Sequence, residues 1–235
     1  MDIQLASFSS SPAGQVMLSD STLDPFVYNL KASHVLCSKN KYRIKAPSTF
    51  DFGKSSRFEI PRYGILNGAV LHVPLTVTAS GGNTVTPTLN LGAMFCARVS
   101  ITSNSREIEQ LPDAASLVEV LELPIGQRDV IMDLSHNNES ADIDSNKTID
   151  LYIPINLSFF TNGMGSFINA SFVENLEINV EVNTKDNLFT LAGTGAVAVD
   201  VANTEMLLYY LNMEEANLRK LEDQAYSLER PLSMA

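Results

Sequence analysis

Cysteine, histidine and tryptophan are scarce in this sequence. The chain of 235 residues contains two cysteines, three histidines and no tryptophan. Cys37 and Cys96 are too few for a disulfide scaffold or a zinc ribbon, so we expect two reduced or buried thiols. The histidines, at positions 34, 72 and 136, do not stand at metal-ligand spacing from another histidine or a cysteine. We therefore expect no bound metal and no other cofactor.

Motifs of known catalytic sites are also missing. The sequence contains no Gly-x-Ser-x-Gly turn, no phosphate-binding loop and no dinucleotide fingerprint. Glutamate pairs such as Glu107 with Glu109, or Glu177 with Glu181, have the composition of a glycosidase acid pair, but without tryptophan they have no aromatic platform for a sugar. His72 lies in an apolar stretch, where a core or interface histidine is expected. We predict no catalytic residues and no enzymatic activity.

Long apolar runs and targeting signals are absent too. No stretch reaches the roughly 18 apolar residues that a membrane-spanning helix needs. The start of the chain has neither a basic group nor an apolar run, so we expect no signal peptide and synthesis in a cytoplasm. Residues 1–30 contain no lysine or arginine. They predict a flexible, serine-rich arm that does not bind phosphate groups.

Charge is low in total and uneven along the chain. Charged residues make up 18% of the sequence, and 27 acidic against 16 basic residues give a net charge of −11. Such a chain is repelled by nucleic acid, so we expect no direct nucleic-acid binding. Residues 39–62 are nevertheless mostly basic among their charged positions, and residues 107–205 are mostly acidic.

Two interpretations of this charge pattern stay open. Both regions are compatible with ordinary solvated faces. Alternatively, the basic face of one copy meets the acidic face of the next and fixes their register. In that case Arg57 and Arg62 are candidate interface residues.

The hydrophobic periodicity predicts β-structure almost throughout. Residues 97–102 and 176–182 alternate between apolar and polar side chains, as half-buried strands do, and residues 70–78 are rich in β-branched side chains. Short strands at this spacing, without alternating helices, predict an all-β antiparallel sandwich. The further strands that we expect are 41–45, 57–60, 149–159, 166–173, 188–191, 195–201 and 205–211.

Two stretches have a helical pattern. In residues 113–122 apolar side chains recur at intervals of three and four residues, as on one face of a helix. A second helix is expected over 213–228, with Asn212 as its N-cap. The polar stretch 135–148 is predicted to be an exposed loop. The chain therefore divides into an arm at 1–30, a β-domain at 31–211, and a helix with a tail at 212–235.

The terminal helix has one apolar stripe to bury, because an isolated helix of this length is marginal in water. The stripe docks either on its own chain or on a neighbouring one, and we predict a role at a junction between copies. The residues of the stripe are Leu218, Leu221, Ala225 and Leu228.

An irregular cation site is a further alternative in the polar loop. Asp142, Asp144 and Asn146 place oxygen atoms at alternate positions, as the start of a calcium loop does. Lys147 stands where such a loop needs glycine, and Ile153 stands where it needs a bidentate glutamate. A helical calcium-binding hand is excluded, and weak cation binding near these residues stays open.

The order of segments resembles one particular family. Several segments resemble, in their order, strands of the first jelly roll in double-jelly-roll major capsid proteins. They are Arg57 to Gly68 with the long β run to Thr78, then 94–101 followed by 104–109, then 151–160 followed by 172–178. That family occurs in large DNA viruses and tailless internal-membrane phages. Residues 206–211, running into 214–220 and 226–229, resemble the strand and charged helix that close that roll. The likeness spans roughly 57–229.

This resemblance implies an antiparallel jelly-roll sandwich with a short internal helix and a C-terminal helix. It implies a capsid protein of the virion, made in the host cytoplasm, that self-assembles into an icosahedral shell through its side faces. The chain resembles a first roll alone, either as a single-roll relative or as part of a longer product. The implied partners are copies of itself and other capsid proteins, with an internal membrane or a minor capsid protein as further candidates. The candidate interface residues are Arg57, Arg62, Leu218, Leu221 and Leu228.

Two other functions stay open from the sequence. A β-sandwich that binds carbohydrate or attaches to a host would expose aromatic side chains on one face. A hydrolase on the same sandwich would need a clustered pair of acids.

Overall fold

The computed structural model describes residues 37–79, 83–111, 125–135, 142–157, 160, 168–171, 173–193 and 197–213. All of them fall in one compact unit, Cys37–Ala235. The predicted arm at 1–30 lies outside the described residues. The predicted domain boundaries therefore stay predictions.

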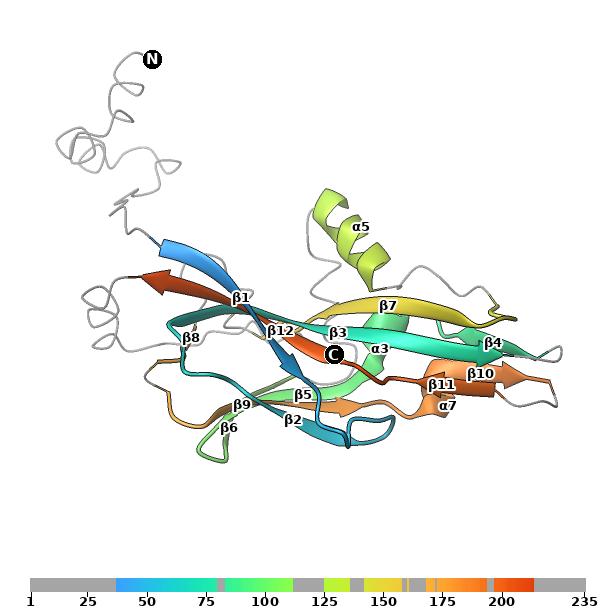
Figure 1. Cartoon of the computed structure of the whole chain (residues 1–235), viewed down its shortest axis with the longest axis horizontal. Helices are drawn as coiled ribbons and strands as arrows, with labels where there is room; N and C mark the ends of the chain where they lie inside the picture. The colour runs from blue at the N-terminus through green and yellow to red at the C-terminus, as the bar shows by residue number, and fades with distance from the viewer. Residues whose placement is uncertain are drawn as a thin grey trace, which may run out of the picture. The chain divides into compact units, whose positions relative to one another are not determined.

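Two antiparallel sheets form the two layers of the domain (Figure 1). The first, which we call sheet A, has the strand order β1, β12, β3, β7, and two short strands, β8 and β11, also pair with β3. The strands of sheet A are β1 (Cys37–Lys45), β3 (Ile65–Ala79), β7 (Lys147–Pro154), β8 (Ile168–Asn169), β11 (Val197–Asp200) and β12 (Glu205–Met213).

The second layer, sheet B, has the strand order β2, β9, β5, β6. β4 and β10 pair with each other and form a separate two-stranded sheet. The strands of this layer and of the pair are β2 (Ser55–Glu59), β5 (Cys96–Ser103), β6 (Arg106–Leu111), β9 (Leu176–Val182), β4 (Thr84–Pro87) and β10 (Phe189–Ala192).

The pairings are nested along the chain. The eight main strands pair from the outside inward: β1 with β12, β2 with β9, β3 with β7, and β5 with β6. A long antiparallel ribbon of this kind, wrapped so that its pairs fall alternately in two sheets, is a jelly roll. The predicted all-β jelly-roll fold is confirmed.

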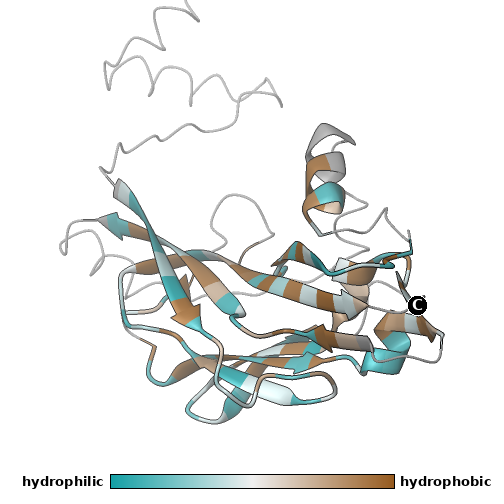
Figure 2. Ribbon diagram, turned by 45° about the vertical axis from the view of Figure 1, so that its right-hand side comes forward, coloured by the Kyte–Doolittle hydropathy of each residue, from teal (hydrophilic) through white to brown (hydrophobic). Residues whose placement is uncertain are grey.

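The alternation of side chains explains why these segments form a sandwich. On β3, Leu71, Val73, Leu75 and Val77 are fully buried, while Thr76 and Thr78 between and beyond them are exposed. The apolar side chains of both sheets meet in one core cluster. Figure 2 shows the same alternation of hydrophobic and hydrophilic positions along the ribbons.

Several strand predictions hold with shifted ends. The strand at 176–182 has the predicted bounds, and the one expected at 205–211 continues to Met213. The strand expected at 149–159 ends at Pro154, and among the described residues of the one expected at 166–173 only β8 is in a strand. Beyond Pro154, the Ile155 N–H still donates to the carbonyl of Ala69 on β3 at 3.0 Å.

Three helices were not expected from the sequence. They are α3 (Leu91–Phe95), α5 (Ile125–Leu134) and α7 (Lys185–Leu188). The helix predicted at 113–122 lies outside the described residues. So does the terminal helix from residue 214 on, and its predicted first residues, Asn212 and Met213, belong to β12.

The prediction of an exposed loop over 135–148 is wrong at four of the described positions: Ser135 and Ile143 are buried, and Lys147 and Thr148 begin β7. Ser135 is 2% exposed and Ile143 is 6% exposed. The Ile143 N–H donates to the carbonyl of Val85 and the Val85 N–H donates back, each at 2.9 Å, which ties this segment to β4. The Ser135 N–H donates to the carbonyl of Ile131 at 3.0 Å, which fixes Ser135 to the end of α5.

Candidate interaction surfaces

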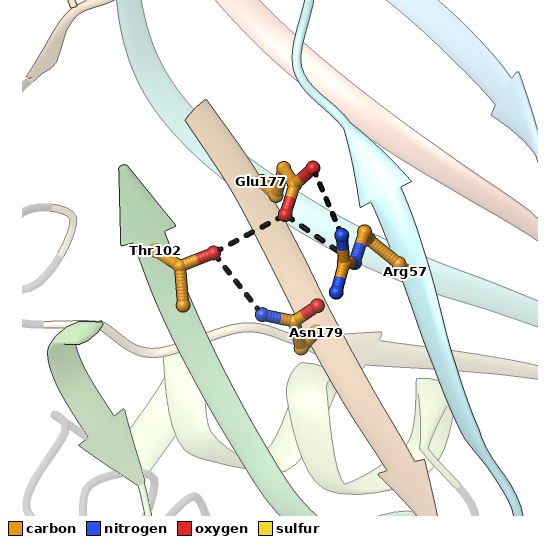
Figure 3. A network of polar contacts seen from close by, with 4 residues as sticks. All are labelled: Arg57, Thr102, Glu177 and Asn179. Atoms are coloured by element: carbon orange, nitrogen blue, oxygen red, sulfur yellow. Dashed lines mark hydrogen bonds and ion pairs between the residues drawn. The ribbon is translucent and has the colours of Figure 1, made fainter. Parts of the chain in front are cut away.

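The outer face of sheet B carries a network of polar side chains from three strands (Figure 3). Arg57 on β2 places its Nε 3.3 Å from Oε2 of Glu177 on β9. The Thr102 hydroxyl on β5 donates to the same carboxylate at 3.4 Å and accepts from the Asn179 amide at 3.2 Å. These four polar side chains are therefore paired with one another within the chain.

Both arginines that were predicted at an interface also make contacts within their own chain. The Arg57 side chain remains 65% exposed beside Glu177. The Arg62 guanidinium donates from Nη2 and Nε to the carbonyl of Ser171, at 2.9 and 3.3 Å. Their contact with a neighbouring copy stays a prediction. Leu218, Leu221 and Leu228 lie outside the described residues.

A row of basic side chains runs along β1, the edge strand of sheet A. Lys39, Lys41, Arg43 and Lys45 occupy alternate positions and are all exposed. Alternate residues of a strand point to the same side, so the four charges share one face. Arg43 Nη1 lies 3.6 Å from Oε2 of Glu205, and Lys41 Nζ lies 5.8 Å from the ring centre of Tyr209.

This basic row was missed at the sequence level, although its signal was present. In the sequence analysis above, these residues belong to a basic region but are not placed on one face of a strand. Because every second residue from 39 to 45 is basic, a strand at 41–45 already predicts a charged face.

The opposite side of β1 contributes to an exposed aromatic pair, which we call the tyrosine patch: Tyr42 and Tyr63. Their side chains are 40% and 53% exposed, and their ring centres lie 5.5 Å apart in an edge-to-face arrangement. Tyr63 also contacts the buried ring of Tyr210, whose hydroxyl donates to the carbonyl of Pro61 at 3.0 Å. Burial raises the pKa of Tyr210 well above its ordinary value.

Titratable side chains elsewhere are arranged in small, local pairs. His72 Nε2 lies 3.0 Å from Oδ1 of Asp150, and its ring stacks on Tyr152 with the ring centres 4.5 Å apart. A hydrogen bond from Lys54 and another from the Phe52 N–H lower the pKa of Asp51. The first pair joins neighbouring strands β3 and β7, and the second lies in the loop between β1 and β2.

The described residues contain no cluster of three or more histidine, cysteine, aspartate or glutamate side chains that could hold a metal. In the candidate cation loop, the Thr86 hydroxyl donates to the carboxylate of Asp142. Cys96 is a buried thiol, as predicted. Among the helices in the described part of the chain, none is long and apolar enough to cross a membrane.

Solved structures that are similar to this chain include viral capsid proteins. The Faustovirus major capsid protein matches with a TM-score of 0.64 and 11% identity, over 86% of this chain and 59% of that chain. PBCV-1 VP54, fitted into a reconstruction of the virophage Sputnik, matches with a TM-score of 0.54 and 11% identity, over 80% and 46%. The STIV MCP matches with a TM-score of 0.52 and 12% identity, over 80% and 52%.

These neighbours are double-jelly-roll major capsid proteins, so the resemblance seen in the sequence is confirmed for the fold. The chain spans between 46% and 59% of the length of these three structures. Neither a family model nor a curated protein matches the sequence.

Proposed function

We propose that this protein is a structural subunit of an icosahedral viral capsid and that its copies assemble through the side faces of the jelly roll. The observation that carries the proposal is the jelly-roll fold, which the chain shares with the Faustovirus major capsid protein over 86% of its length. A sandwich with a filled core offers flat outer faces to its neighbours, and assembly of a shell needs such faces and no reactive group.

The partners that we propose follow from this role. They are copies of the same chain and other capsid proteins, with an internal membrane or a minor capsid protein as further candidates. The proposed location is the virion, after synthesis in the host cytoplasm. Neither catalysis nor direct nucleic-acid binding forms part of the proposal, and the net charge of −11 disfavours the latter.

The interface that we propose includes Arg57, Arg62 and the leucines at 218, 221 and 228. Arg57 lies on the outer face of sheet B, and Arg62 lies in the segment between β2 and β3. Glu177 pairs with Arg57 inside the chain, so a change of Arg57 alone alters both the surface charge and this pair. The two effects have to be separated by experiment.

Native mass spectrometry of the full-length chain tests the proposal. We expect oligomers of defined stoichiometry whose population grows with concentration. A chain that stays a folded monomer at every concentration and ionic strength would refute the assembly role.

A charge swap tests the part played by Arg57. The variant Arg57→Glu should lower the oligomer population. The double variant Arg57→Glu with Glu177→Arg restores an ion pair in the chain but keeps a reversed charge at position 57. If assembly returns fully in the double variant, Arg57 acts through its own chain and not through a neighbour.

A further inference from the structure

The outer face of sheet B carries more carboxylates than guanidinium groups among its described residues. The charged side chains that the strand registers place on this face are Arg57, Glu59, Arg98, Glu107, Glu177 and Glu181. Each arginine has an ion pair on the face, one with Glu177 at 3.3 Å (Figure 3) and the other with Glu107 at 2.6 Å. Glu59 and Glu181 are exposed and take part in no ion pair within the described part of the chain. The face therefore keeps two unmatched negative charges.

The outer face of sheet A has the opposite excess along β1. The basic row there consists of Lys39, Lys41, Arg43 and Lys45. Arg43 pairs with Glu205 on β12, whereas the three exposed lysines form no ion pair with any described residue. The other carboxylates that the registers place on this face, Asp150 and Asp200, lie on β7 and β11, and neither strand pairs with β1. The β1 side of the face therefore keeps unmatched positive charges.

Both arrangements bring like charges together within a single copy. Glu59 lies directly opposite Glu177 on the neighbouring strand, and like charges in this position destabilise a sheet. Lysines at alternate positions of β1 are only about 7 Å apart along the strand. A covering surface of opposite charge reduces repulsion of both kinds. The two faces of this chain provide such surfaces for each other when they belong to different copies.

The unmatched charges of the two faces also agree in spacing. Lys41 and Lys45 are four residues apart, which is about 13 Å along a strand. Glu59 is in register with Glu177, which is four residues from Glu181, so the two carboxylates have the same separation along the strand direction. Packed sheets usually keep their strands within about 30° of each other. Two lysines of one copy can therefore meet two glutamates of the next at the same time.

We propose that the outer face of sheet A in one copy packs on the outer face of sheet B in the next, with Lys41 and Lys45 opposite Glu59 and Glu181. Contact between two A faces would bring the lysine rows together, and contact between two B faces would bring the glutamates together, so only unlike faces attract. This proposal deepens the proposed function and rests on its self-association, because it names which side faces meet.

A contact of this kind determines how assembly proceeds. The two surfaces in it are different, so each copy uses one face for one neighbour and the other face for a second neighbour. Such a heterologous contact closes into a ring when the rotation between neighbours fits a whole turn. A capsomer is built in this way from identical contacts.

Two charge reversals, each confined to one face, test the proposal. Lys41→Glu with Lys45→Glu makes the β1 side of sheet A acidic, and Glu59→Lys with Glu181→Lys makes the face of sheet B basic. Native mass across a dilution series gives the concentration at which half of the full-length chain is in oligomers. We expect each double variant to need a concentration about tenfold higher than wild type.

The quadruple variant, which carries both reversals, identifies the partner of each face. Its two faces again have opposite charges, and its net charge is that of wild type, −11. The sheets are the two layers of the sandwich, so their outer faces point away from each other within one copy (Figure 1). Recovery of assembly in this variant therefore reports contact between copies, and we expect that recovery. Assembly that stays as weak as in the double variants would overturn the proposal.

Net charge alone predicts a different order of the variants. The reversal on sheet B makes the chain less negative, which would promote assembly if only general repulsion mattered, whereas we expect it to weaken assembly. Lys147→Glu with Lys185→Glu changes the net charge as much as the reversal on sheet A does, but on β7 and α7, and it should leave assembly unchanged. A melting temperature close to that of wild type shows that each variant is folded.

Failure of this contact and failure of the proposed function give different results. Wild-type oligomers that persist unchanged in both double variants would refute the contact between faces and leave the capsid role intact. A wild-type chain that stays monomeric at every concentration would refute both.

Discussion

At the scale of single residues, close contacts between backbone segments place the strongest limits on substitution. Gly92 in α3 is buried, and a side chain there would overlap the carbonyl oxygen of Ser135 and come within 2.5 Å of its Cβ. Ser135 follows α5, so this one glycine lets the two helices approach each other. The constraint is one of space, because the backbone angle of Gly92 lies outside the left-handed region.

We predict that Gly92→Ala destabilises the fold by about 1–3 kcal/mol, as other overpacked sites do. Alanine favours a helix over glycine by roughly 1 kcal/mol, so a net loss would show that the contact with Ser135 dominates. Urea unfolding of both chains measures the difference. Gly68→Ala is the matched control: its new side chain would lie 3.9 Å from Tyr209, and we expect a change within about 0.5 kcal/mol. Equal stability of Gly92→Ala and wild type would contradict the packing.

Tyr210 links stability to alkaline pH. In the unfolded chain a tyrosine loses its proton near pH 10, whereas burial raises the pKa of Tyr210 in the folded chain. Its contribution to stability is therefore present below about pH 10 and is lost as the pH rises further, because only the unfolded chain then releases the proton. Tyr210→Phe should lose about 1 kcal/mol at neutral pH, with the hydrogen bond to Pro61, but should show a weaker decline above pH 10. Parallel declines in both chains would count against this assignment.

At the scale of elements, the sequence predicts the positions of many strands but not which strands pair with each other. β9 was predicted at its observed bounds because each second residue from Leu176 to Val182 is apolar and buried. α5 was missed because its apolar residues, Val130 among them, do not form a clear stripe, and Val130 itself is 57% exposed. β4 has four residues, and its position depends on contacts with β10 about one hundred residues later in the chain, which no local pattern encodes.

The candidate interface residues illustrate the same limit. Their exposure could be expected from charge, but their partners could not. Arg57 pairs with Glu177, which is 120 residues away in sequence, and Arg62 with Ser171, which is 109 residues away. Such contacts depend on which strands become neighbours in the sheet. The basic row of β1 is the opposite case, since the strand period alone places its four charges together.

The network on sheet B should add little to stability. Arg57 is 65% exposed, so its pair with Glu177 is screened by water. A double-mutant cycle with Arg57→Ala and Glu177→Ala should give a coupling energy of at most about 1 kcal/mol. A coupling of several kcal/mol would show that this face is desolvated within the single chain.

At the scale of the whole molecule, the charge of the β1 surface is opposite in sign to the net charge of the chain. The chain is acidic overall, with a net charge of −11, yet β1 presents a basic row at the edge of sheet A. The acidic surface of other copies attracts this basic row. The row also discourages two β1 edges from pairing with each other, because their lysines would meet.

Assembly should therefore weaken as salt is added. Exposed charges are screened beyond roughly 8 Å at physiological ionic strength. Light scattering of the full-length chain across a salt series measures the effect, with the melting temperature of the domain as the control for folding. Assembly that is insensitive to salt would remove the electrostatic part of the account and leave the apolar contacts.

The central claim is that copies of this jelly roll build a shell by their side faces. Electron microscopy of the gently purified full-length chain, beside its native mass, tests it most directly. We predict ring-shaped capsomers or larger closed particles, with the rolls standing upright to the shell surface. A field of separate particles of 25.7 kDa at every concentration and salt would contradict the claim.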